Sequence, residues 1–155
     1  MDSSHPRLLG VYETVLYAPD IAAAAEFYAE TLGLTLLEEP NDCRAAFRLE
    51  DGAVLLIFDP DCVSVPGRPV PSHGATGPGH VAFAVEPGGL GRFEIELRRR
   101  GVDIEHELAW DEGGRSLYLR DPAGNSVELV EGEAWPGRSY RPGDASARPA
   151  PARRS

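Results

Sequence analysis

One order of secondary-structure elements occurs twice in this chain of 155 residues. Hydrophobic periodicity predicts a strand, a helix and three further strands within residues 11–58, and the same succession within residues 79–130. The two halves align so that Glu13 falls on His80. A long period that occurs only twice indicates two fused modules, each with one sheet face to bury, and argues against a solenoid. We therefore predict an α+β fold in which two fused βαβββ modules form a curved mixed sheet around a cleft.

The spacing of apolar residues gives the bounds of these elements. Asp20 is expected to cap the first helix, and Gly33 and Gly101 are expected to end the first and second helices. The predicted helices span residues 20–32 and 89–100, and the predicted strands span residues 11–18, 34–37, 44–49, 53–58, 79–85, 102–110, 115–120 and 126–130.

Composition separates the modules from their connections. Residues 59–79 contain five prolines and four glycines with little apolar periodicity, which indicates a loop. The chain from Trp135 onward is rich in proline, glycine, alanine, serine and arginine, and it cannot bury enough apolar surface to order itself. We assign the first module to residues 8–60, the connecting loop to residues 61–79, the second module to residues 80–132 and a flexible tail to residues 133–155.

Charge and residue usage exclude several classes of function. The net charge of -10 argues against nucleic-acid binding, because phosphate contacts need a basic face. All fifteen basic residues are arginine, which excludes lysine Schiff-base chemistry and a P-loop. No apolar run is long enough to span a membrane and no signal segment follows Met1–Arg7, so we expect a cytoplasmic protein with no membrane partner. Cys43 and Cys62 fit neither a disulfide framework nor a zinc knuckle, and we expect both to be reduced.

Three ionisable residues occupy matching positions on the predicted strands. In residues 79–85, His80 lies on the face that carries two small alanines, so it faces a space that another group can fill. Alternation places Glu128 on the same open face, and Glu13 has the equivalent position on the first strand. Two carboxylates and an imidazole gathered without a cation would repel and lose hydration, and a divalent metal would remove that cost. The alternative, which alternation alone leaves equally open, is that both glutamates are exposed and His80 is a structural histidine.

Four stretches of the chain resemble one known family. They are Glu13–Asp20 (ETVLYAPD), Glu26–Tyr28 with Leu32–Leu34 (EFY and LGL), Gly79–Phe83 (GHVAF) and Leu119–Leu129 (LRDPAGNSVEL). Over residues 8–132 the chain resembles the vicinal oxygen chelate superfamily, which includes glyoxalase I, extradiol dioxygenases, fosfomycin-modifying enzymes, methylmalonyl-CoA epimerase and bleomycin-resistance proteins. The resemblance implies paired βαβββ modules around a metal-binding cleft, a homodimer, and capture of a substrate's neighbouring oxygens on a divalent metal.

Carried onto this sequence, the resemblance implies that Glu13, His80 and Glu128 hold one divalent metal ion per chain. Two oxygen ligands and one nitrogen ligand suit Mn, Fe(II), Ni, Zn or Mg and leave positions for substrate or water. Glu13 stands where the family usually has histidine or glutamine. Glyoxalase I also uses a glutamate on the last strand of the first module, whereas residues 54–58 (VLLIF) contain no acid. The three-ligand pattern instead agrees with the fosfomycin enzymes and the dioxygenases.

Further candidate residues surround the predicted metal site. A general acid or base has to reach the cleft, and an anionic substrate would be bound by arginine. For each candidate the alternative is a solvated side chain. The candidates are His73 and Tyr118 as catalytic residues and Arg44, Arg48 and Arg115 as substrate-binding residues.

Two classes of function remain open. The first is a metal-dependent lyase, isomerase or dioxygenase of the vicinal oxygen chelate type, in which the metal polarises a small molecule bound through adjacent oxygens. The second is a metal-free protein of the bleomycin-resistance type, which binds or sequesters a small molecule such as an antibiotic. Three ligand-type residues in matching positions favour the enzyme. In both cases the partner is a small molecule, and we expect a homodimer.

Overall fold

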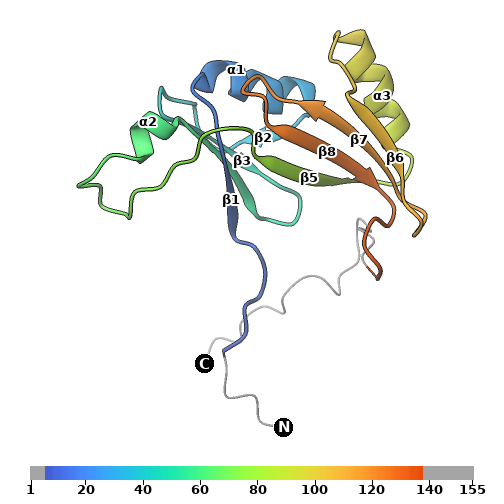
Figure 1. Cartoon of the computed structure of the whole chain (residues 1–155), viewed down its shortest axis with the longest axis horizontal. Coiled ribbons are helices and arrows are strands. Elements are labelled where there is room, and N and C mark those ends of the chain that lie inside the picture. Colours follow the sequence, from blue (N-terminus) through green and yellow to red (C-terminus); the bar gives the residue numbers. More distant parts are fainter. Residues whose placement is uncertain (1–5, 138–155) are drawn as a thin grey trace.

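The computed structural model describes residues 6–137 and contains two mixed four-stranded sheets that follow one another along the chain (Figure 1). In each sheet the module's first strand pairs in parallel with its last strand, and the remaining pairs are antiparallel. The predicted α+β fold of two βαβββ modules is confirmed, as two separate sheets. The first sheet has the order β1 (Glu13–Tyr17), β4 (Val54–Phe58), β3 (Arg44–Arg48), β2 (Thr35–Leu36), and the second has the order β5 (His80–Val85), β8 (Ser126–Glu131), β7 (Arg115–Arg120), β6 (His106–Ala109).

One main helix covers each sheet. The helix α1 (Ile21–Glu26) continues into a π-helical turn, η1 (Phe27–Thr31), and packs on β3 and β4. The helix α3 (Leu90–Arg99) packs on β7 and β8 (Figure 1). As predicted, Asp20 caps α1: its carboxylate accepts a hydrogen bond of 3.0 Å from the backbone N–H of Ala23.

The two modules share a single hydrophobic core. Strand alternation sends one face of each sheet into it, and we call the opposite faces the open faces of the first and second sheets. Leu16, Phe47 and Ile57 from the first sheet and Leu117 and Val127 from the second belong to the core cluster. The open face of the first sheet therefore carries Glu13, Val15, Tyr17, Arg44, Ala46, Arg48, Val54, Leu56 and Phe58, and that of the second carries His80, Ala82, Ala84, His106, Leu108, Ser116, Tyr118, Arg120, Ser126, Glu128 and Val130.

The turn between β7 and β8 joins the modules. The buried Tyr28 hydroxyl donates a hydrogen bond of 2.8 Å to Asp121 Oδ2. The side-chain amide of Asn125 donates to the backbone carbonyl of Tyr17 over 3.0 Å and its oxygen accepts from the N–H of Gly79 over 2.7 Å. The stretch that most resembles the family therefore fixes the start of β5, where His80 lies, against the end of β1.

The predicted connecting loop differs from the structure in two ways. A short helix, α2 (Pro60–Val63), opens it, because Asp59 caps this turn and Pro60 fits its first position. The expectation of reduced cysteines is wrong, since Cys43 and Cys62 form a disulfide with Cα atoms 5.7 Å apart. The pairing of β3 with β4 brings these residues together, and the N–H of Asp59 donates to the carbonyl of Cys43 over 2.9 Å.

The predicted flexible tail, residues 133–155, falls mostly on residues 138–155, which lie outside the described residues. Within residues 6–137, no helix is both long enough and apolar enough to cross a membrane.

Candidate metal centre

His80 and Glu128 meet on the open face of the second sheet. The Nε2 atom of His80 lies 3.4 Å from Oε2 of Glu128. Because Glu128 pairs with Ala82 in the register of β5 and β8, its side chain rises next to that of His80. The His80 side chain is 51% exposed and the Glu128 side chain is 9% exposed. The pair therefore has one solvent-facing nitrogen donor and one nearly buried carboxylate.

Hydrogen bonds behind the pair orient both side chains. His80 Nδ1 lies 3.1 Å from the carbonyl oxygen of Ser126, which can only accept, so Nδ1 carries the hydrogen. In the neutral ring, the Nε2 lone pair then points toward Glu128. Glu128 Oε1 accepts a hydrogen bond of 2.6 Å from the Ser116 hydroxyl, while Oε2 faces His80. A nitrogen lone pair and a carboxylate oxygen that face each other can share a proton or bind a cation, and these two ligand types suit a divalent metal.

Glu13 is not brought to this pair within one chain. It is the first residue of β1 and lies exposed on the open face of the first sheet. Across residues 6–137, no three side chains of histidine, cysteine, aspartate or glutamate are arranged to hold a metal ion. One chain therefore unites two of the three predicted ligands.

Tyr118 lies next to Glu128 on the open face of the second sheet. It is the register partner of Glu128 on one side and of His106 on the other, and the centroids of the His106 and Tyr118 rings are 6.0 Å apart. Partial burial, followed by the hydrogen bond and charge of Glu128, raises the pKa of Tyr118. Its hydroxyl therefore keeps its proton at neutral pH.

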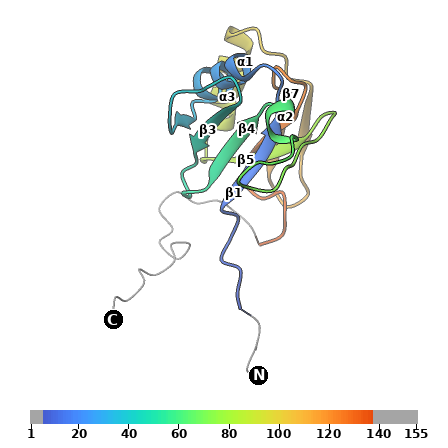
Figure 2. The same cartoon turned by 90° about the vertical axis from the view of Figure 1, so that its left-hand side faces the viewer.

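His73 of the connecting loop and the two arginine candidates of the first module lie around the open face of the first sheet. The Tyr17 hydroxyl is 2.6 Å from His73 Nδ1, and the His73 ring also packs edge-on against Phe58, with centroids 5.3 Å apart. The loop that carries His73 lies in front of β1 in Figure 2. Arg44 pairs with Glu38 at 2.7 Å, and Arg48 donates to the carbonyl of Gly52 over 2.7 Å.

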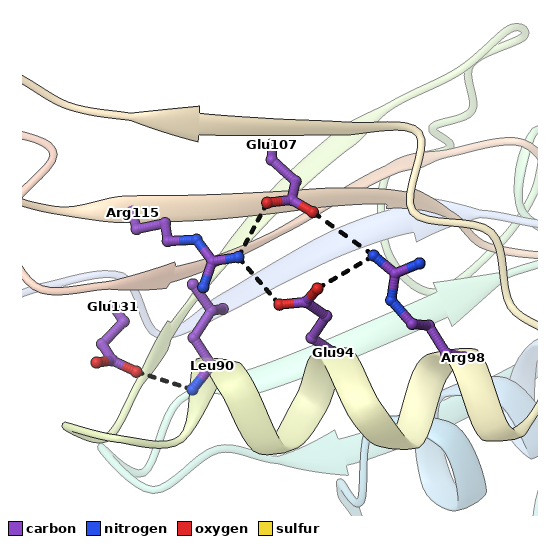
Figure 3. Close-up of polar contacts among 6 residues, drawn as sticks. All are labelled: Leu90, Glu94, Arg98, Glu107, Arg115 and Glu131. Carbon is purple, nitrogen blue, oxygen red and sulfur yellow. Dashed lines mark hydrogen bonds and ion pairs between the residues drawn. The ribbon is translucent and has the colours of Figure 1, made fainter.

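Arg115 lies on the opposite side of the second sheet from His80 and Glu128. Its guanidinium contacts Glu94 of α3 at 3.0 Å and Glu107 of β6 at 2.9 Å, as Figure 3 shows. Alternation explains the difference from the prediction, because Arg115 shares its face of β7 with Leu117. The structure thus removes Arg115 from the face that carries the candidate metal centre and makes it part of a network with α3.

Two residues of the site were missed by sequence reasoning. Ser116 is fully buried and bonds Glu128, and the Trp110 indole N–H donates to the Ser116 hydroxyl oxygen over 2.8 Å. Alternation with Tyr118 could have found Ser116. Trp110 follows the end of β6 and reaches Ser116 across a turn, so strand alternation gave no signal for it.

Comparison with known proteins defines the family. The sequence model of the Glyoxalase/Bleomycin resistance protein/Dioxygenase superfamily matches residues 10–129. The chain belongs to this superfamily. A similar solved structure is a lactoylglutathione lyase from Agrobacterium tumefaciens, with 36% identity and a TM-score of 0.76 over 82% of this chain and 96% of that one.

More distant members of the superfamily share the fold. A glyoxalase/dioxygenase from Nostoc punctiforme is 28% identical, with a TM-score of 0.61 over 79% of this chain and 90% of that one. A putative glyoxalase family protein from Bacillus anthracis is 21% identical, with a TM-score of 0.64 over 83% of this chain and 99% of that one. No curated protein matches the chain.

Proposed function

We propose that this superfamily member is a divalent-metal-dependent enzyme that acts on a small molecule through two adjacent oxygens. One observation carries the proposal: His80 Nε2 and Glu128 Oε2 face each other at 3.4 Å, and each side chain is held from behind by a hydrogen bond. Metal-binding histidines and carboxylates are oriented in this way. When bound, the metal would act as a Lewis acid on the substrate oxygens.

The third ligand in this proposal is Glu13 of a second copy of the chain. Glu13 and His80 lie on different sheets, so a homodimer would have to bring the open face of the first sheet of one copy onto the open face of the second sheet of the other. The segment before Glu13 supports such an association, because it carries exposed apolar side chains that a second copy could cover. These are Leu8, Leu9, Val11 and Tyr12.

The remaining candidate residues have complementary roles in the proposal. Tyr118, which keeps its proton at neutral pH, would donate a hydrogen bond or a proton to a substrate oxygen. Arg44 and Arg48 would bind an anionic group of the substrate. His73, which lies against the open face of the first sheet, would act as a general acid or base toward the substrate. The strand β4 supplies no acid, so we propose a site with three protein ligands.

Calorimetric titration of acetohydroxamate, a small bidentate oxygen ligand, tests the enzyme proposal against the alternative. We expect binding to the metal-loaded protein and none to the metal-free protein, since the ligand needs open positions on the metal. Equal binding to both forms, or to neither, would overturn the proposal and favour a sequestering protein, which would bind larger compounds through its side chains.

Co-expression of two defective chains tests the shared site. Glu13→Ala and His80→Ala each remove a ligand, but a mixed dimer retains one site with Glu13 from one copy and His80 from the other. We expect the purified mixed dimer to bind one metal ion, and each separate variant to bind none with parental affinity. A mixed dimer without metal binding would contradict the shared site.

A further inference from the structure

The geometry points to Ser116 and Trp110 as positioning residues for Glu128, an inference that rests on the proposed function. Three polar groups form a chain on the open face of the second sheet. Trp110 Nε1 lies 2.8 Å from Ser116 Oγ, and Ser116 Oγ lies 2.6 Å from Glu128 Oε1. Ser116, the second residue of β7, is completely buried.

The donor groups fix the direction of donation in this series of hydrogen bonds, from Trp110 through Ser116 to Glu128. The indole N–H of Trp110 can only donate, so it occupies an acceptor position on the Ser116 oxygen. The single hydroxyl proton of Ser116 is then free to be donated to Glu128 Oε1. A single arrangement of protons therefore makes both hydrogen bonds, the one from Trp110 to Ser116 and the one from Ser116 to Glu128.

This arrangement fixes the orientation of the Glu128 carboxylate plane. With one carboxylate oxygen held by Ser116, turning the plane away would break a largely buried hydrogen bond, so the other oxygen stays directed at His80 Nε2. A ligand that is already oriented loses less entropy when it binds a metal. Loss of such an outer hydrogen bond typically weakens metal binding by about 10- to 100-fold.

Co²⁺ binding to three variants tests the inference. Ser116→Ala removes the bond to Glu128, and Trp110→Phe keeps an aromatic ring but removes the N–H that directs the serine proton. Trp135→Phe is the matched control, because Trp135 is the other tryptophan and is 75% exposed. In the Trp135→Phe protein, Trp110 is the sole tryptophan, so its fluorescence reports changes next to Glu128.

We expect Co²⁺ affinity to fall by about 10- to 100-fold in Ser116→Ala and by less in Trp110→Phe, and to be unchanged in Trp135→Phe. We also expect Co²⁺ to change Trp110 fluorescence in the Trp135→Phe protein, and to change it much less when Ser116→Ala is added. Thermal unfolding of the metal-free variants separates this from a purely structural role, which would lower the melting temperature and leave Co²⁺ affinity unchanged.

The outcomes distinguish this inference from the proposed function. A parent protein that binds Co²⁺ only with His80 present, together with a Ser116→Ala variant of parental affinity, would overturn the inference alone. A parent protein that binds no Co²⁺ would overturn the proposed function and the inference with it.

Discussion

The hydroxyl of Tyr28 in the first module donates a hydrogen bond of 2.8 Å to Asp121 Oδ2 in the second. Burial, together with the Asp121 carboxylate, raises the pKa of Tyr28, so the hydroxyl stays protonated and keeps donating. We expect Tyr28→Phe to lower the free energy of unfolding by about 1–3 kcal/mol, because it leaves a buried carboxylate with one donor fewer. Urea denaturation measures this, with Glu112→Gln at an exposed position as control. A loss no larger than that of the control would show that the bond does not hold the modules together.

Glu131 replaces a missing cap at the start of α3. Gly89 has no side chain to cap the helix, and Glu131 Oε2 accepts from the N–H of Leu90 over 2.8 Å (Figure 3). Hydrogen bonds from the backbone of Leu90 and Gly88 lower the pKa of Glu131. Since the folded pKa is depressed, the stabilisation is present above the ordinary glutamate pKa and is lost as the pH falls through the lowered value.

We therefore expect Glu131→Gln to lower the free energy of unfolding at pH 7 by about 1 kcal/mol and to make stability less dependent on pH in the acid range. Denaturation curves at a series of pH values measure both effects. Glu112→Gln, an exposed position, is the control. Parallel pH profiles for parent and Glu131→Gln would contradict the capping assignment.

The disulfide between Cys43 and Cys62 joins the start of β3 to α2, which begins the loop that carries His73. Removal of a disulfide typically costs about 2–4 kcal/mol, and we expect that loss for the double variant Cys43→Ser and Cys62→Ser. Thiol titration of the purified, unfolded parent measures the bond directly, and we expect no free thiol. Two free thiols would instead agree with a cytoplasmic protein, since disulfides are rare in that compartment.

Arg115 lies on the face of the second sheet that α3 covers, opposite the open face. We expect Arg115→Gln to leave metal and acetohydroxamate affinities unchanged, because its partners Glu94 and Glu107 lie across the sheet from Glu128. Its pair contacts are partly exposed, so a loss of stability below about 1 kcal/mol is expected. Arg98→Gln, in the same network, is the control. A selective loss of ligand affinity in Arg115→Gln would return this residue to the site.

Strand alternation accounts for much of the agreement between sequence and structure. It placed His80 and Glu128 on one face with the core residues opposite, and these two side chains meet in the structure. The same rule assigns Arg115 to the core face, because it is an odd number of positions from Ser116 and Tyr118. The prediction for Arg115 did not apply this rule.

Contacts between distant residues could not be predicted in this way. The Cys43–Cys62 bond depends on the register of β3 against β4, which brings Arg44 opposite Phe58. Trp110 reaches Ser116 through a tight turn. The place of Glu13 depends on how the two sheets pack, and two modules of equal topology can pair within a chain or between chains.

Metal content tests the proposed metal site at His80 and Glu128 most directly. Protein purified without chelator should contain one divalent metal ion per chain, and His80→Ala should fold and contain none, because it removes the Nε2 donor that faces Glu128. Acidification should release the metal from the parent protein, since protons compete for all three proposed ligands. Parental metal affinity in folded His80→Ala protein would contradict the assignment of this site.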